Sequence, residues 1–208
     1  MSARSKSSSR WLQEHFSDAF VKQAKSKGWR SRAVFKLEEI DKREKLLRPG
    51  RVCLDLGAAP GAWSQYALRQ VGRTGRVIAT DILAMPPLAG LEFVRGDFRE
   101  PEVFAAVLAL CPERGVDVLL SDMAPNLSGV DAIDAPRSMH LSELALELAA
   151  RVLKREGTAL IKVFQGAGFE ALVRAARVQF ETVKLLKPQA SRARSSELYL
   201  LAKALVMV

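Results

Sequence analysis

DLGAAPGA, residues 55–62, joins a strand-like run over 51–54 to a helix-like run over 63–68. A strand that ends in glycine and small residues and then leads into a helix is where an α/β fold binds a nucleotide-like ligand. Glycines let the backbone approach the ligand closely, and the ligand lies at the carboxyl ends of the strands. This stretch therefore predicts a ligand site at the end of the first strand.

The remainder of the chain alternates between strand and helix patterns. Runs such as 77–80 and 116–120 are apolar on both faces, which is typical of a parallel sheet covered by helices on both sides. We predict an α/β, Rossmann-like fold with a mostly parallel seven-stranded sheet, helices on both faces and an antiparallel hairpin at the edge, since no helix separates the last two strands. The expected strands are 51–56, 76–82, 91–95, 116–122, 158–164, 181–187 and 197–203, and the expected helices are 10–25, 33–46, 62–71, 100–110, 138–154 and 168–179.

The composition is that of one globular unit. The chain has 208 residues, 49% hydrophobic and 26% charged, and such a length can bury a core without disulfides or metals. Cys53 and Cys111 lack zinc-ligand spacing, so we expect no metal and a reducing, cytoplasmic compartment. No apolar run approaches the ~18 residues of a membrane span, so no membrane partner is expected. We expect the protein to be a monomer.

Positive charge is concentrated at the N-terminus. Residues 1–36 hold nine lysines and arginines against two acids, a net +7 of the chain's +9. Aromatic residues interleave with these charges, which favours a nucleic-acid partner over the alternative of a solubilising surface. We interpret residues 1–9 as a disordered basic tail rather than a transit peptide, residues 10–50 as a basic helical extension and residues 51–208 as the α/β domain.

The glycine loop lacks a phosphate-binding signature. Gly57 and Gly61 form G-x-x-x-G rather than G-x-G-x-x-G, and no Gly-Lys-Ser/Thr follows them. Asp81 ends the second strand, where a carboxylate suits the paired hydroxyls of an adenosine ribose. Asp97 ends the third strand, where its carboxylate is suited to accept a hydrogen bond from the exocyclic amine of an adenine. Trp63, just past the glycine loop, is suited to form an apolar wall of the ligand site. An adenosine ligand without a phosphate chain indicates S-adenosylmethionine as the cofactor.

The ends of the later strands limit the acceptor chemistry. SDMAPN, residues 121–126, lacks the Asp/Asn-Pro-Pro-aromatic motif of base-amine methyltransferases, and no cysteine lies near it for C5-methylation of a base. Lys162 closes an otherwise apolar fifth strand, either as a functional group or as a lysine that reaches the rim. Glu197 lies on the last strand, which we expect at the sheet edge, where a carboxylate is usually a solvated charge.

Six stretches of the chain resemble the RrmJ/FtsJ (RlmE) family, the bacterial 23S ribosomal RNA ribose 2′-O-methyltransferases. The family usually has Pro-Gly-Gly-Trp where this chain has Pro60-Gly61-Ala62-Trp63. Alanine is a better helix former than glycine at the start of a helix, so the departure leaves the resemblance intact. The matching stretches are residues 9–16, 30–37, 55–66, 121–126, 162–166 and 192–199.

The resemblance implies a catalytic Lys-Asp-Lys-Glu tetrad, formed by Lys36, Asp122, Lys162 and Glu197. A ribose 2′-hydroxyl must lose its proton as it attacks the sulfonium methyl, so the enzyme supplies alignment and a base. By resemblance Lys162 is the base and Lys36 the neighbouring cation. Asp122 would orient Lys162 and would itself lie close to the methyl-bearing sulfur of the cofactor, and Glu197 would position the lysines or the ribose.

The resemblance also implies the reaction and its partner. The expected reaction is methyl transfer to a uridine 2′-hydroxyl in the A-loop of 23S ribosomal RNA, within the 50S subunit. The alternatives are the same chemistry on transfer RNA or another RNA, a non-catalytic ribosome-assembly factor and a dinucleotide oxidoreductase. Residues 125–137 are expected to form a loop beside the site, either a lid or a plain connection. The residues expected to bind RNA phosphates are Arg10, Arg30, Arg32, Arg192 and Arg194.

Overall fold

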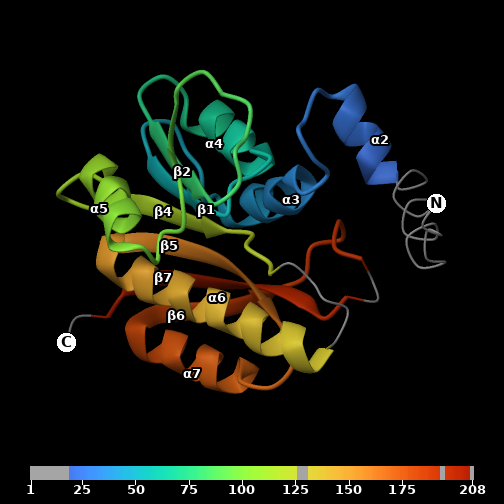
Figure 1. Ribbon diagram of the computed structural model, residues 1–208, viewed down its shortest axis with the longest axis vertical. Coiled ribbons are helices and arrows are strands. Elements are labelled where there is room, and N and C mark those ends of the chain that lie inside the picture. Colours follow the sequence, from blue (N-terminus) through green and yellow to red (C-terminus); the bar gives the residue numbers. More distant parts are fainter. Residues whose placement is uncertain (1–18, 126–130, 193–194, 207–208) are drawn as a thin grey trace, which may run out of the picture.

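The computed structural model describes residues 19–125, 131–192 and 195–206, without the side chains of residues 131–133. Its elements alternate along the chain as the sequence predicts (Figure 1). The helices are α2 (Ala19–Ser26), α3 (Val34–Glu44), α4 (Ala62–Val71), α5 (Pro101–Leu110), α6 (Asp131–Val152) and α7 (Phe169–Gln179). The strands are β1 (Val52–Leu56), β2 (Arg76–Asp81), β3 (Leu91–Arg95), β4 (Val116–Ser121), β5 (Leu153–Phe164), β6 (Phe180–Leu186) and β7 (Glu197–Leu205).

All seven strands form one sheet in the order β3-β2-β1-β4-β5-β7-β6. Strands β1 to β5 pair in parallel, and β7 is antiparallel to both β5 and β6. Strands β2 and β3 extend the sheet on one side of β1. Strands β4, β5, β7 and β6 extend it on the other side. The carboxyl ends of β1 and β4 therefore lie at the point of reversal, where open α/β sheets bind their ligands.

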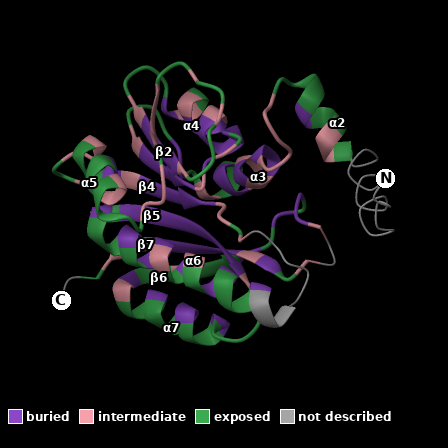
Figure 2. Cartoon of the chain, in the orientation of Figure 1, coloured by how far each residue is buried: buried purple, intermediate pink, exposed green. Residues whose placement is uncertain are grey.

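Two hydrophobic clusters cover the two faces of the sheet. One contains buried residues of α5, α6 and α7, and the other contains buried residues of α3 and α4. Figure 2 shows the strands as largely buried, with exposed residues on the outer sides of the helices. Alternate residues of β7 enter opposite clusters, since Tyr199 and Leu201 face α3 and α4 while Leu200 and Ala202 face α6 and α7. The predicted α/β fold with helices on both faces is confirmed.

The glycine loop has the local geometry that the sequence predicts. Gly61 precedes α4 with φ +98°, and Ala62 begins the helix. The departure from Pro-Gly-Gly-Trp therefore puts alanine where helical backbone angles are needed. Gly57 has φ +69°, and a Cβ atom there would overlap the side chain of Met123. Both glycines are required by the backbone itself.

Three sequence expectations are corrected. Strand β7 lies inside the sheet and β6 forms its edge, so Glu197 is not an edge residue. Helix α6 begins at residue 131 rather than 138, which leaves a shorter connection than the expected 125–137 loop. Pro136 lies in the second turn of α6. A proline so near the start of a helix removes only one of its first backbone hydrogen bonds, so the helix tolerates it. Strand β5 begins at Leu153, five residues before the expected start at 158. Its pairing with β4 shifts register between Val116 and Val118, which accommodates the polar residues 154–157.

The N-terminal segment packs into the cluster on one face of the sheet, through Ala24 of α2 and mainly through α3. Val34, Leu37 and Ile40 belong to the same buried cluster as α4. Helix α2 is the described part of the helix expected over 10–25. The expected tail 1–9 lies outside the described residues, so the domain division stays a prediction. No helix in the described ranges combines the length and apolarity of a membrane span.

Candidate active site

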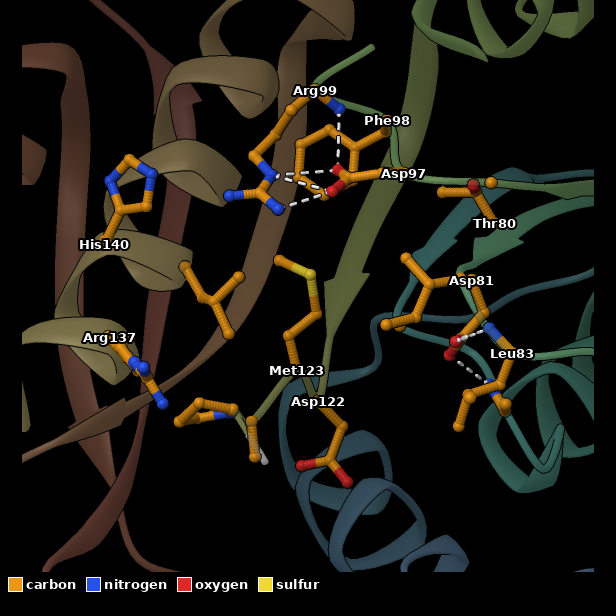
Figure 3. Close-up of a pocket in the computed structure, with 17 residues that line it drawn as sticks. Thr80, Asp81, Leu83, Asp97, Phe98, Arg99, Asp122, Met123, Arg137 and His140 are labelled. Atoms are coloured by element: carbon orange, nitrogen blue, oxygen red, sulfur yellow. Dashed lines mark hydrogen bonds and ion pairs between the residues drawn. The ribbon is translucent and has the colours of Figure 1, made fainter. Parts of the chain in front are cut away.

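A cavity of about 540 Å³ lies at the carboxyl ends of β1 to β4, within the ~300–1,000 Å³ range of small-molecule sites. Figure 3 shows Asp81, Asp97 and Asp122 around the side chain of Met123. The three carboxylates come from separate strand ends, which the parallel sheet brings to one edge. Further lining residues are Gly57, Ala59, Thr80, Ile82, Leu83, Gly96, Phe98, Arg99, Ala124, Pro125, Arg137, His140 and Leu141.

Asp81 shapes the loops beside the cavity. Its Oδ2 accepts a hydrogen bond from the Ala59 amide at 2.8 Å, and its Oδ1 accepts one from the Leu83 amide at 2.7 Å. The neighbouring Thr80 hydroxyl oxygen is buried and has no hydrogen-bond partner within the described part of the chain. Ile82 and Leu83 are 58% and 60% exposed and line the same cavity. A ligand with hydroxyls and a flat apolar ring would satisfy these groups.

Asp97 lies in the cavity but already has a partner. Arg99 donates hydrogen bonds from its Nε to both carboxylate oxygens of Asp97 at 2.9 Å. These hydrogen bonds lower the pKa of Asp97, so it is a carboxylate at neutral pH. An adenine amine at Asp97 would therefore share this carboxylate with Arg99.

Trp63 lies elsewhere than the sequence suggested. It is 3% exposed, its Nε1 donates to the carbonyl of Ala33 at 2.8 Å, and its ring packs 5.7 Å from the ring of Tyr199. It lines a small pocket beside the main cavity rather than the cavity itself. Gly61 also lies outside the lining of the main cavity. Trp63 thus attaches the segment before α3 to α4.

Lys162 and Asp122 form the centre of the expected tetrad. The Nζ of Lys162 lies 3.1 Å from Oδ1 of Asp122 and donates to its backbone carbonyl at 2.9 Å. Burial raises the pKa of Asp122, but the charges of Lys162 and Lys36, together with hydrogen bonds from Tyr199 and Lys162, outweigh burial, so the pKa lies below its usual range. Asp122 lines both the main cavity and the small pocket. It is therefore an ionised group at the junction of the two.

Lys36 and Glu197 complete the tetrad from α3 and β7. The Nζ of Lys36 lies 2.7 and 2.8 Å from the two carboxylate oxygens of Glu197, and Ser191 donates to one of them at 2.7 Å. The two side chains are only 13% and 10% exposed. Glu197 is held by two partners inside the protein, in contrast to a solvated edge charge.

Tyr199 links the two halves of the tetrad, and the sequence analysis did not identify it. It lies opposite Lys162 in the antiparallel β5–β7 pairing. Its hydroxyl donates to Oδ1 of Asp122 at 2.6 Å, and Lys36 lies 5.8 Å above its ring. Burial, together with the charges of Asp122 and Glu197, raises the pKa of Tyr199 well above its usual value. Its position two residues after Glu197, on the same strand face, is the signal that could have revealed it.

Asp55 is a further buried carboxyl near this site. It is the penultimate residue of β1, is 1% exposed, and accepts a hydrogen bond from the Ser64 hydroxyl at 2.6 Å. Burial raises the pKa of Asp55 to about 7, with a smaller contribution from the charges of Asp122 and Asp81.

The expected RNA-binding arginines differ in their surroundings. Arg32 donates to the carbonyl of Ala190 and lies 5.5 Å from the ring of Phe20. Arg30 donates to carbonyl oxygens on two loops beside the cavity. Arg192 is half-buried near the tetrad strand, whereas Arg10 and Arg194 lie outside the described residues. Among the described residues, no group of three or more His, Cys, Asp or Glu side chains could hold a metal ion.

Comparison with known proteins assigns the family. The model of the FtsJ-like methyltransferase family matches residues 29–205. The chain is 58% identical over 203 residues to the ribosomal RNA large subunit methyltransferase E of Stenotrophomonas maltophilia, covering 98% of this chain and 97% of the relative. It is 55% identical over 201 residues to the protein of the same name from Legionella pneumophila, covering 97% of this chain and 98% of the relative.

The chain belongs to the FtsJ-like methyltransferase family. The resemblance noted from the sequence is thereby confirmed, and the protein is a methyltransferase.

Solved structures agree with this family assignment. A Plasmodium falciparum protein described as a ribosomal RNA methyltransferase superposes with a TM-score of 0.76 at 26% identity, covering 86% of this chain and 100% of that one. Aeropyrum pernix fibrillarin, solved with bound S-adenosylmethionine, superposes with a TM-score of 0.57 at 16% identity, covering 83% of this chain and 74% of that one. The second similarity concerns the fold alone.

The site thus has two adjoining parts. The main cavity presents carboxylates and apolar side chains, and the expected tetrad beside it presents two lysines and two carboxylates. Asp122 belongs to both parts.

Proposed function

We propose that this protein transfers a methyl group from S-adenosylmethionine to the ribose 2′-hydroxyl of a uridine in the A-loop of 23S ribosomal RNA, in the 50S subunit. The relatives named as ribosomal RNA large subunit methyltransferases support the RNA class. The observation that carries the chemistry is the Lys162–Asp122 contact at the edge of the cavity. In this function the protein acts in the cytoplasm, where ribosomal subunits assemble in bacteria, and as a monomer.

The cavity residues fit an adenosine-type donor. Asp81 offers its carboxylate to the ribose hydroxyls, and the buried Thr80 hydroxyl offers an unused hydrogen-bonding group. Ile82 and Met123 supply apolar contacts for the ring, and Gly57 admits the ligand close to the backbone. When bound, the cofactor supplies an electrophilic methyl group on a sulfonium.

The tetrad would handle the acceptor hydroxyl. Lys162, as the neutral amine, takes the proton from the 2′-oxygen as that oxygen attacks and becomes an ammonium, and Asp122 holds its Nζ in place. Lys36 supplies a positive charge, which stabilises the developing negative charge on the oxygen. Glu197 fixes Lys36 through two short contacts. Much of the rate enhancement then comes from alignment, because the methyl group is already activated.

The RNA would approach from the side of the N-terminal segment. Arg32 lies just before α3 and Arg192 just before β7, the two elements that carry Lys36 and Glu197. Arg10 and Arg194, which lie outside the described residues, belong to the N-terminal basic segment and to the stretch before β7. These cations would contact phosphates, so affinity for RNA should fall steeply as salt rises.

The deciding experiment compares Lys162→Ala with Lys154→Ala. Both lysines lie on β5 and contact an aspartate, but Lys154 pairs with Asp117 at 2.7 Å, away from the cavity. With 50S subunits lacking the modification, Lys162→Ala should lose methyl transfer by about 10²–10⁴-fold, and Lys154→Ala should be near wild type. Normal transfer by Lys162→Ala would refute the proposed mechanism.

Methylation and binding measurements on the wild-type protein separate the alternative functions. Transfer RNA methylated in preference to 50S subunits would indicate a different RNA substrate. Binding to subunits without any transfer would indicate an assembly factor, and binding of NAD in preference to S-adenosylmethionine would indicate an oxidoreductase.

A further inference from the structure

The guanidinium of Arg30 contacts three backbone carbonyls on two separate loops. Its Nη1 donates to the carbonyl oxygens of Pro60 at 3.0 Å and Pro86 at 2.7 Å, and its Nη2 donates to that of Pro87 at 2.9 Å. Three of its five N–H groups are therefore used within the protein.

These two loops form adjoining walls of the cofactor cavity. Pro60 belongs to the glycine loop after β1, in which Gly57 and Ala59 line the cavity. Pro86 and Pro87 follow Ile82 and Leu83, which line it from the end of β2. Asp81 joins the same loops on the cavity side, through the Ala59 and Leu83 amides. The same two loops are therefore linked twice. Asp81 links them on the side that faces the cavity, and Arg30 links them on the other side.

Local structure holds Arg30 at this place. Its backbone amide donates to Oε1 of Gln65 at 3.2 Å, and Nε2 of Gln65 donates to the carbonyl of Gly28 at 2.9 Å. Gly61 leaves room for the guanidinium, since a Cβ atom there would lie 2.8 Å from Nη1 of Arg30 and 3.1 Å from Sδ of Met85. Helix α4 and the glycine loop together define the position of the arginine.

We propose that Arg30 is a positioning residue that holds the glycine loop and the 82–87 loop at the spacing needed to bind the cofactor. This inference rests on the proposed function, because it assumes that the cavity binds S-adenosylmethionine. It differs from the expectation that Arg30 binds an RNA phosphate. A planar guanidinium can donate to several carbonyls on different loops, whereas a lysine ammonium is a compact charge without that fork.

The test measures cofactor binding by calorimetry in the absence of RNA. The variants are Arg30→Lys and Arg30→Ala, with Arg73→Ala as the control, since Arg73 is exposed in the turn after α4. Both Arg30 variants should bind S-adenosylmethionine about tenfold more weakly, which corresponds to loss of one net charge-assisted hydrogen bond. The control should bind like wild type. At saturating cofactor, kcat should recover, so the defect should appear in KM.

A phosphate contact would give a different pattern. Arg30→Lys would then keep wild-type cofactor affinity, while Arg30→Ala would weaken RNA binding and reduce its salt dependence, and this result would overturn the inference. Gln65→Ala provides a milder variant with the same expected direction, should Arg30→Ala melt at a lower temperature. Failure of the wild type to bind S-adenosylmethionine would refute the proposed function. Equal binding by wild type and all variants would refute only the role of Arg30.

Discussion

Tyr199 donates its hydroxyl to Oδ1 of Asp122 at 2.6 Å, the same oxygen that lies 3.1 Å from Nζ of Lys162. The other carboxylate oxygen is therefore not needed for either contact. Two partners on one oxygen fix the plane of the carboxylate, which lies at the junction of the cavity and the small pocket. Tyr199 thus orients Asp122, a member of the expected tetrad.

Replacing Tyr199 by Phe should lower kcat roughly tenfold, through loss of a hydrogen bond to a charged group. The hydrogen bond lowers the pKa of Asp122, so its loss should raise that pKa and move the acidic limb of the pH–rate profile to higher pH. The control is Tyr66→Phe, which removes a 3.0 Å hydrogen bond to buried Asp41, away from the tetrad. It should change stability but not the pH profile. An unchanged profile in Tyr199→Phe would argue against the positioning role.

The Lys36–Glu197 pair should contribute measurably to stability. Either single variant, Lys36→Met or Glu197→Gln, should lose about 3 kcal/mol of unfolding free energy, because it leaves one buried charge without its partner. The double variant should lose less than the sum of the two. Urea denaturation of all four proteins gives the coupling energy.

An exposed pair offers the matched control for that cycle. Lys42 and Glu38 lie one helical turn apart at 2.8 Å, with Lys42 69% exposed. Their coupling should be only about 0.3–0.5 kcal/mol. Equal coupling in the two pairs would mean that burial does not strengthen the tetrad contact.

Asp55 should make stability depend on pH. Burial raises the pKa of Asp55 to about 7 in the folded protein, above the ~3.9 of an unfolded aspartate. The folded state therefore binds this proton more tightly, so its stability falls as pH rises from about 4 to about 7. Compared with Asp55→Asn, wild type should lose stability across this range in urea denaturation. A constant difference between the two proteins would show that Asp55 ionises normally.

Gly57 should affect cofactor binding as well as the stability of the fold. Gly57→Ala adds a Cβ that overlaps Met123 and forces a side chain to adopt φ +69°, whereas Gly72→Ala imposes a similar φ of +64° with nothing within 4 Å. Each backbone angle should cost about 1–3 kcal/mol of stability in an alanine variant, and Gly57→Ala should lose more because its Cβ overlaps Met123. Only Gly57→Ala should also weaken binding of S-adenosylmethionine. Equal cofactor affinity in the two variants would remove Gly57 from the site.

The sequence predicted those parts of the fold that depend on local pattern. The strands before residue 122 and helix α4 could be located from apolar runs and from glycines at their ends. Asp81, Asp97 and Asp122 could be brought together because the ends of parallel strands share one edge. The start of β5 could not be located, because its polar residues 154–157 lie in an irregular pairing.

Long-range contacts explain what local pattern missed. The place of Lys36 in the site came only from resemblance, since it depends on how α3 packs on the sheet. Tyr199 is defined by its pairing with Lys162 across β5 and β7, and Arg30 by carbonyls more than 25 residues away. The residues next to Arg30 do not indicate these partners, and the local signal for Tyr199 is its position two residues after Glu197. The burial of Glu197 likewise depends on distant partners, because Lys36 of α3 and Ser191 contact its carboxylate.

The β5–β7 register limits how the chain can change in length. Lys162 lies opposite Tyr199 and Phe164 lies opposite Glu197, so the spacing of two between Glu197 and Tyr199 puts both on the tetrad face. Insertion of a single residue between them would turn one toward the opposite face. The connection over 187–196 precedes this pairing and can gain or lose residues without changing which face they occupy. Within this hairpin, length variation compatible with activity should therefore fall in that connection and not in β7 itself.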